Sequence, residues 1–273
     1  MSGRSGPGSG DAAATPLGVP SRTAWLDGVN PVAKVAMVIV LAVPLLVSID
    51  AVSAATAIVL ELSCVPLTGV AFGTVLKRLV PVMLFAPVAG LSMLLYARPG
   101  GTVYGSFLFA TVSDNSIQLS VAVLLRVVAL ALPMILLFAR TDPTELADAL
   151  AQVAKLPSRF VLGVLAGART VGLFVDDWRT MTLARRARGL GDRGAVRRFF
   201  SMAFVLLVFA VRRGTKLATA MEARGFGSGI ERTWARPSTL SARDATAVGG
   251  AILLMVVALG AAVVTGAFRV VGS

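Results

Sequence analysis

Long apolar runs separated by short polar segments make up most of this chain. A helix needs about 20 residues to cross the hydrocarbon core of a bilayer. Five runs approach or exceed that length, at residues 32–49, 51–72, 79–95, 117–138 and 247–268. Only Asp50 separates the first two runs, which indicates a very tight turn. The runs predict an all-α integral membrane protein with about five transmembrane helices.

The composition supports membrane insertion and excludes several classes of function. Hydrophobic residues make up 56% of the chain and charged residues 15%, against roughly 45–50% and 25% in soluble domains. The formal charge of +12 does not indicate a nucleic-acid partner, because nucleic-acid binders interleave basic residues with aromatics on a soluble fold. With no His and one Cys, a histidine-based triad, a typical zinc site and a thiol redox pair are excluded.

The remaining segments divide the chain into four parts. Residues 1–22 are rich in Gly, Ser, Pro and Ala, which predicts a disordered cytoplasmic tail and not a signal peptide. Residues 23–140 carry the first four spans, and residues 239–273 carry the last span and the C-terminus. Residues 141–238 form a block of cytoplasmic or interfacial helices between the fourth and fifth spans.

Basic residues concentrate in this block. Seventeen of the 26 Lys and Arg residues lie between Arg140 and Arg236. Positive charge marks the cytoplasmic segments of membrane proteins, so the block is placed inside. Alternation of the spans then puts the N-terminus inside and the C-terminus outside. Only Arg98 and Arg269 are left on the outer side.

Three helices are predicted within the block. The sequence Asp142-Pro143-Thr144-Glu145 is typical of a helix start, and Pro157 ends that helix. Ser158 can cap a second helix, which we expect over residues 160–188. A third helix is expected over residues 196–224.

Two apolar stretches in these helices, residues 160–175 and 199–211, leave the number of spans open. We expect both to lie against the membrane face, although insertion of either would change the count. Gly163 and Gly167 form a G-x-x-x-G pattern that allows another helix to approach closely.

The same short signature ends both of the longer helices. Ala187-Arg188-Gly189 and Ala223-Arg224-Gly225 are each followed by a large apolar residue and another Gly. Gly is the usual left-handed helix terminator, and Arg in the last turn is favoured by the helix dipole. Ordinary capping explains one copy. Two copies on similar helices indicate a pair of guanidinium tips suited to docking into acidic pockets.

These residues resemble the transmembrane T component of energy-coupling factor transporters, the EcfT or CbiQ family. The resemblance rests on the paired Ala-Arg-Gly motifs, on "LDGVNPVAK" from Leu26 and on "RTDPTELADAL" from Arg140. It covers roughly residues 26–268. The sequence departs from the family at "LDGVNP", where a shorter entry to the first span is usual.

The resemblance implies a larger assembly. Such proteins join two ATP-binding cassette ATPases to a substrate-binding S component that captures a vitamin or a transition-metal ion. Arg188 and Arg224 would sit in grooves of the two ATPases, and residues 160–175 and 199–211 would contact the S component, unless they pack against the protein's own spans. ATP would be used by the partners, and this chain would bind no cofactor and lie in the plasma membrane. The substrate is not readable from this chain.

The sequence itself offers little for catalysis. No G-x-x-x-x-G-K-[ST] phosphate loop occurs, since Ala195 and Val196 follow the glycines with the right initial spacing. Glu61 and Arg126 lie inside apolar runs, where we expect a structural charge pair if their depths match. A secondary transporter, another type of ABC permease and an intramembrane enzyme are the alternatives, but inverted repeats and convergent titratable groups are not evident.

Overall fold

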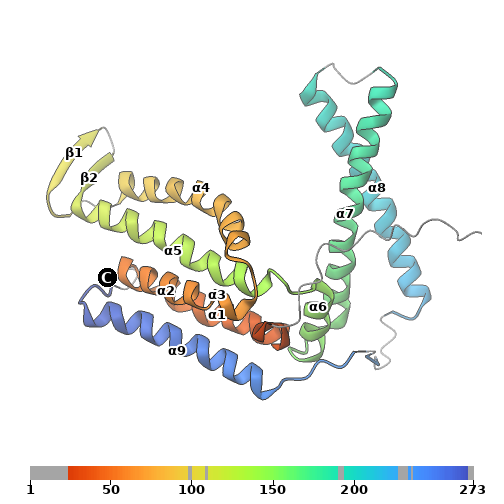
Figure 1. Cartoon of the computed structure of the whole chain (residues 1–273). Coiled ribbons are helices and arrows are strands. Elements are labelled where there is room, and N and C mark those ends of the chain that lie inside the picture. The colour runs from red at the N-terminus through yellow and green to blue at the C-terminus, as the bar shows by residue number, and fades with distance from the viewer. Residues whose placement is uncertain are drawn as a thin grey trace, which may run out of the picture.

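The computed structural model describes residues 24–97, 100–107, 110–189, 194–226, 233–234 and 236–269. It has two parts, a helical bundle and a crossed pair of long helices that stands apart from it (Figure 1). The bundle consists of α1 (Pro31–Val47), α2 (Ala51–Ser63), α4 (Phe72–Tyr96), α5 (Asp114–Phe138) and α9 (Ala242–Val264). The crossed pair consists of α7 (Ser158–Ala187) and α8 (Ala195–Ala223). The helix α6 (Pro143–Gln152) lies between the two parts.

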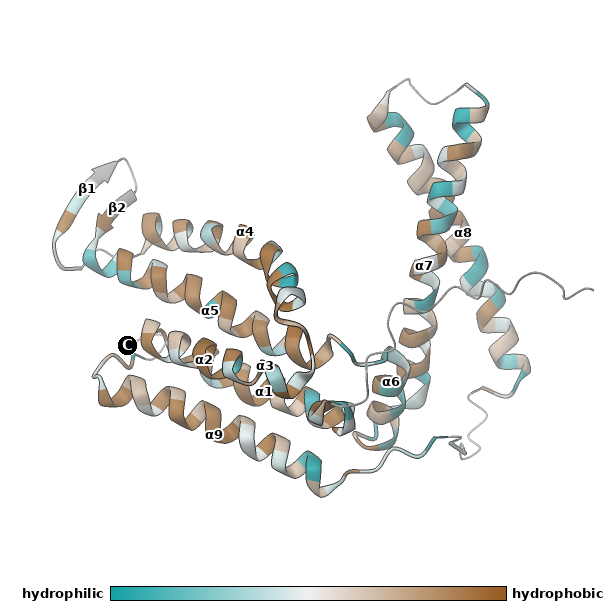
Figure 2. Ribbon diagram, in the orientation of Figure 1, coloured by the Kyte–Doolittle hydropathy of each residue, from teal (hydrophilic) through white to brown (hydrophobic). Residues whose placement is uncertain are grey.

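The bundle is held together by an apolar core to which small residues contribute much of the packing. One cluster of buried residues draws on α1, α2, α5 and α9, with Leu45, Ala57, Ala129 and Ala258 fully buried at its centre. Without a hydrophobic driving force in lipid, small residues let helices approach closely enough for good van der Waals contact. Large apolar side chains are exposed on the outward faces, and the bundle helices are apolar over most of their length (Figure 2). Such a bundle suits a lipid surround.

The helix lengths qualify the expected count of five spans. Among the described residues, four helices are long and apolar enough to cross a membrane: α4, α5, α7 and α9. The helices α1 and α2 have 17 and 13 residues, about 26 and 20 Å at 1.5 Å per residue. The class of all-α membrane protein is confirmed, whereas the number of five spans is not.

The second apolar run does not form one helix over residues 51–72, so that prediction is wrong. Helix α2 ends at Ser63, and a separate turn, α3 (Val65–Thr68), follows it. Pro66 cannot donate a backbone hydrogen bond to the preceding helix, and it lies in the first turn of α3, where none is needed. Gly69 then takes a positive φ of 63°, and α4 begins at Phe72, seven residues before the expected start.

A β-hairpin connects α4 to α5 and was not predicted. Strand β1 (Val103–Phe107) pairs antiparallel with β2 (Ala110–Ser113), from Val103 opposite Ser113 to Phe107 opposite Ala110. Ser113 caps α5 through a reciprocal capping box with Ser116. The hairpin marks one end of the bundle, here called the hairpin end, and α6 lies near the other, here called the α6 end (Figure 1).

A buried polar network ties α1 to α9 at the α6 end. The carboxylate of Asp244 accepts hydrogen bonds from the backbone N–H of Asn30 at 2.6 Å and from that of Ser241 at 2.6 Å. The Asn30 side chain donates to Ser238 Oγ at 2.9 Å and accepts from the N–H of Val32 at 2.9 Å. The first and last helices of the bundle are thereby fixed to one another.

Replacing Asp244 with Ala is expected to lower the free energy of unfolding by about 2 kcal/mol, because the buried N–H of Asn30 and the partly buried N–H of Ser241 lose their acceptor. The measurement is denaturant unfolding of the purified protein in detergent. The control is Thr265→Ala at the other end of α9, whose hydroxyl, among the described residues, bonds to carbonyls of its own helix; we expect a change within about 0.5 kcal/mol. Equal effects of the two variants would contradict the importance of the network.

Candidate coupling helices and their arginine tips

The two long helices of the basic block form close to where the sequence predicts them. They were expected over residues 160–188 and 196–224 and are found at Ser158–Ala187 and Ala195–Ala223. With 30 and 29 residues, they extend about 45 and 44 Å. Both run across the direction of the bundle helices (Figure 1). Helix α7 therefore does not lie parallel to the bundle helices, although its length and composition would permit it to cross a membrane.

The predicted caps of the block are partly right. Asp142 accepts a hydrogen bond from the backbone N–H of Thr144 at 2.7 Å, so it caps α6 as expected. Ser158 is not a cap, because it is the first residue of α7 and Pro157 holds the cap position without a side-chain bond. Helix α6 ends at Gln152, before Pro157.

Side-chain contacts fix the crossing of α7 and α8. The rings of Trp178 and Phe199 lie 5.6 Å apart between centroids. Arg213 forms an ion pair with Asp177 at 3.1 Å, and its guanidinium lies 5.6 Å from the centre of the Phe174 ring. Although the Arg213 side chain is half-exposed, a guanidinium that is both paired with a carboxylate and stacked on an aromatic ring holds a defined geometry. The crossing therefore has specific as well as apolar contacts.

The Ala-Arg-Gly motifs end these helices through left-handed glycines. Gly189 and Gly225 have φ values of +70° and +74°, as the sequence predicts. At the end of α8, the N–H of Gly225 bonds to the Glu222 carbonyl at 2.9 Å and the N–H of Phe226 to the Met221 carbonyl at 3.0 Å. This pair of bonds is the Schellman motif. The N–H of Gly189 makes the matching bond to the Arg186 carbonyl at 3.0 Å.

Both arginines of the motifs project from the ends of the helix pair. All six motif residues are exposed: Ala187, Arg188, Gly189, Ala223, Arg224 and Gly225. Within the part of the chain that the structure describes, neither Arg188 nor Arg224 forms an ion pair. Because α7 and α8 are antiparallel, the two carboxyl ends lie at opposite ends of the pair (Figure 1). The arrangement presents two separate cationic tips.

Two of the segments quoted for the family resemblance meet at the α6 end of the bundle. Arg140 forms an ion pair with Asp27 at 2.7 Å and donates to the Gly69 carbonyl at 2.8 Å. Lys34 Nζ donates to Thr141 Oγ1 at 3.3 Å. The sequence of neither segment predicts this contact, because Asp27 and Arg140 are 113 residues apart.

Helix α6 links the bundle to the crossed pair. It packs against α1 and α7. Arg169 of α7 donates to Thr144 Oγ1 at 3.0 Å. At the other end of α6, the Gln152 side chain donates to the Arg236 carbonyl at 3.0 Å and accepts from the Ser238 N–H at 2.8 Å. A displacement of α7 thus has a hydrogen-bonded route to α1 and α9.

The expected pairing of Glu61 with Arg126 is wrong. Both oxygens of Glu61, and Nε and one terminal nitrogen of Arg126, are buried without a hydrogen-bond partner among the described residues. Glu61 lies in the last turns of α2. The acidic group that acts electrostatically on Arg126 is Asp50, at the opposite end of α2. The depths of the two charges therefore do not match.

An exposed apolar face runs along α7. Phe160 and Val164 are each 73% exposed, and Val171 follows on the same face at 58%. A Cβ atom placed on Gly163 or Gly167 would have no described atom within 4 Å outside its own turn of helix, so open space lies beside both glycines. The alternative that this stretch packs against the protein's own spans is not borne out. Helix α8 adds exposed aromatic residues at positions 199, 200 and 204.

Comparison with known proteins identifies the family. A family model described as "Cobalt transport protein", CbiQ, matches residues 22–233. The chain belongs to the CbiQ family. The match takes in α1 to α8 and ends before α9. The expected family is therefore confirmed.

Curated relatives of this CbiQ protein carry the name energy-coupling factor transporter transmembrane protein EcfT. The relative from Brevibacillus brevis is 27% identical over 248 residues, covering 85% of this chain and 92% of its own length. That from Lacticaseibacillus paracasei is 30% identical, covering 69% and 75%. That from Exiguobacterium sibiricum is 29% identical, covering 68% and 73%.

Replacing Gly189 with Ala is expected to fray the end of α7, because a side chain in the left-handed conformation costs about 1–2 kcal/mol. Hydrogen exchange of the last-turn amides should accelerate about fivefold or more. Gly214→Ala is the control, since Gly214 lies inside α8 with open space around it; it should stabilise α8 by up to about 1 kcal/mol. Unchanged exchange in Gly189→Ala would contradict the role given to Gly189.

Proposed function

We propose that this CbiQ protein is the transmembrane coupling and scaffold subunit of an energy-coupling factor importer. Two ATP-binding cassette ATPases bind its two arginine tips, and an S component binds its apolar coupling-helix surface. The S component selects the cargo, a vitamin or a transition-metal ion. The chain itself performs no catalysis and binds no cofactor, and ATP is consumed by its partners. The two exposed arginine tips at opposite ends of one helix pair carry the proposal.

The chemistry of the tips suits an acidic groove. A guanidinium keeps its charge at all physiological pH values and offers planar, bidentate donors to a carboxylate. Ala187 and Ala223 precede the arginines and leave room for a close partner surface. Arg188 and Arg224 are thus the anchors, one for each ATPase. Neither arginine forms an ion pair with another described residue, so both charges are available to a partner.

The motion of the ATPases reaches the membrane through α6. When the two ATPases close or open, the ends of α7 and α8 move relative to one another about their crossing at Trp178 and Phe199. Arg169 passes displacement of α7 to α6, and the hydrogen bonds of Gln152 pass it to the segment before α9. The S component binds the apolar face of α7 and the exposed aromatic residues of α8. This motion tilts or releases it.

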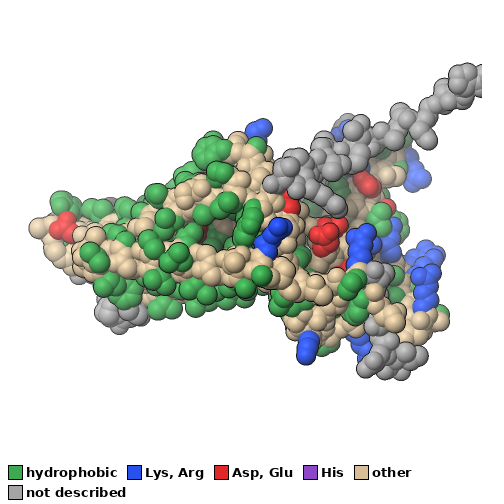
Figure 3. Space-filling view, turned by 60° about the horizontal axis from the view of Figure 1, so that its bottom comes forward, with side chains coloured by type: hydrophobic (Ala, Val, Ile, Leu, Met, Phe, Trp, Pro, Cys, Tyr) green, Lys and Arg blue, Asp and Glu red, His purple; other side chains and the backbone are tan. Residues whose placement is uncertain are grey.

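The charge distribution supports a plasma-membrane protein whose N-terminus is cytoplasmic. Lys and Arg side chains gather over the crossed pair and the α6 end, whereas apolar side chains cover the bundle (Figure 3). Basic segments remain on the cytoplasmic side of bacterial membranes. The ATPases must bind on that side, where ATP is available.

Replacing both Arg188 and Arg224 with Ala is expected to abolish co-purification of the ATPases and substrate uptake. Each single replacement should weaken ATPase binding by about 10- to 100-fold, since a charged hydrogen bond contributes about 1.5–3 kcal/mol. The matched control replaces Arg179 and Lys216, two exposed cations away from the tips. Normal uptake by the tip variant, with intact membrane insertion, would contradict the proposal.

Replacing Gly167 with Leu is expected to remove the S component while the ATPases stay bound. The added side chain blocks the close approach of a partner helix to α7. Co-purification of all subunits measures both contacts at once, and Gly214→Leu on α8 serves as the control. Retention of the S component together with full uptake would place its binding surface elsewhere.

A further inference from the structure

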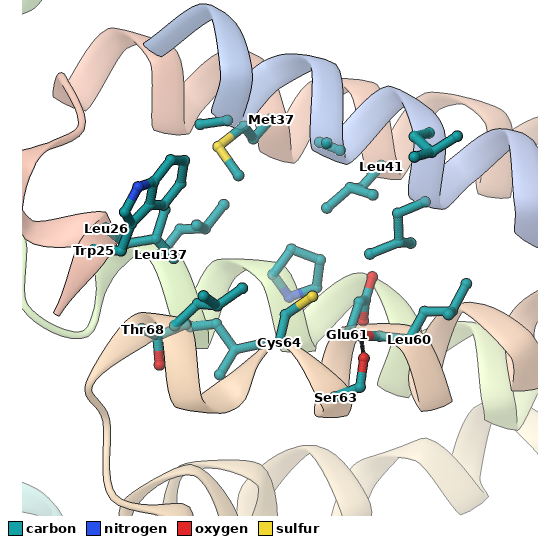
Figure 4. Close-up of a pocket in the computed structure, with 18 of the residues that line it drawn as sticks. Trp25, Leu26, Met37, Leu41, Leu60, Glu61, Ser63, Cys64, Thr68 and Leu137 are labelled. Carbon is teal, nitrogen blue, oxygen red and sulfur yellow. Dashed lines mark hydrogen bonds between the residues drawn. The ribbon is translucent and has the colours of Figure 1, made fainter. Parts of the chain in front are cut away.

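A cavity of about 410 Å³ lies inside the bundle at the α6 end (Figure 4). It is bounded by α1, α2, α3, α5, α9 and the short 3-10 helix at Trp25–Gly28. Its walls are apolar, with side chains such as Met37, Leu41, Leu137 and Leu254. This volume falls within the range of about 300–1,000 Å³ that is usual for small-molecule sites.

The carboxyl group of Glu61 is the exception in this apolar wall. Glu61 is only 2% exposed, and neither of its oxygens accepts a hydrogen bond from a described residue. Its side chain extends from α2 toward the cavity (Figure 4). The nearby hydroxyls are engaged elsewhere: Ser63 donates to the Leu60 carbonyl at 2.6 Å, and Thr68 donates to the Val65 carbonyl at 2.7 Å.

A buried carboxyl group without a hydrogen-bond donor is costly, so a ligand that supplies a donor to it would bind favourably. None of the described residues lining the cavity is Lys or Arg. The cavity is also open on the outer side of the bundle, where Leu67, Leu253 and Val257 on its rim are 49%, 65% and 47% exposed. These rim residues face the lipid in a bundle of this kind, so the ligand enters from the bilayer.

We propose that this cavity binds one lipophilic amine, with its ammonium group on Glu61 and its apolar part against the surrounding walls. An ammonium offers three donors and a positive charge to the two unpartnered oxygens. An alcohol matches the apolar walls but brings no charge, and a fatty acid would place a second carboxyl group beside Glu61. The site is separate from the arginine tips and does not depend on the coupling function.

Cys64, the single cysteine of the chain, lines the same cavity and reports its occupancy. The full-length protein is placed in phosphatidylcholine nanodiscs, and the rate of Cys64 modification by N-ethylmaleimide is measured with equal membrane fractions of dodecylamine, dodecanol or dodecanoate. Dodecylamine should slow modification about tenfold at saturation. Dodecanol and dodecanoate should have little effect. Equal protection by dodecylamine and dodecanol would overturn the proposal.

Two kinds of variant separate recognition by Glu61 from general crowding. Glu61→Gln keeps the side-chain size but removes the charge, and it should abolish the difference between dodecylamine and dodecanol. Val257→Trp on the rim should block dodecylamine protection with Glu61 intact. Val256→Trp, on the exposed lipid side of α9 and outside the cavity lining, should leave protection unchanged. Undiminished dodecylamine protection in Glu61→Gln would overturn the assignment to Glu61.

The amine can come from a free lipophilic amine or from an aminophospholipid. Nanodiscs with added phosphatidylethanolamine distinguish these sources. If the lipid headgroup is the ligand, modification of Cys64 should be slow in them without dodecylamine, and Glu61→Gln should restore it. If a free amine is the ligand, phosphatidylethanolamine should not slow modification, whereas dodecylamine still should. Absence of protection by both amines would mean that the cavity holds no amine.

Discussion

The connection between α7 and α8 is short, and this forces the two helices to run antiparallel. Their carboxyl ends therefore point away from each other, and the same Ala-Arg-Gly signature appears at two distant places. Left-handed Gly189 and Gly225 stop the helices directly after the arginines, so that both guanidiniums stand at the tips. One repeated local signal and one short connection thus place two exposed guanidiniums at opposite ends of a single helix pair, and the proposed docking of two ATPases rests on this arrangement.

Polar contacts at the α6 end help to join the bundle to the crossed pair. The Asp27–Arg140 ion pair and the Asp244 network fix the beginning of the bundle to its last helix and to the start of α6. Gln152 and Arg169 extend these contacts to the segment before α9 and to α7. Apolar packing in a bilayer has little directional preference. Directional hydrogen bonds at this end are therefore well suited to carry motion from the crossed pair into the bundle.

The local features were predictable from sequence, and the long-range ones were not. The ends of α7 and α8 lie within two residues of their predicted positions, because Gly in a helix-ending context has a strong conformational preference. The break after Ser63 was missed because hydropathy does not register where Pro66 interrupts an apolar run. The prediction of a Glu61–Arg126 pair was wrong because position in the sequence does not show how far along the packed bundle each side chain lies. The contacts of Asp27, Gln152 and Asp244 join residues that are 113, 84 and 214 positions apart in the sequence. No local sequence pattern predicts contacts over such separations.

Site-specific photo-cross-linking tests the central claim most directly. A benzophenone amino acid replaces Ala187 in one variant and Ala223 in another, and the assembled complex is irradiated and analysed by mass spectrometry. The account predicts that each position cross-links to an ATPase subunit next to its nucleotide-binding fold, and that both adducts form in one complex. Cross-links from either position to the protein's own bundle, with none to an ATPase, would contradict it.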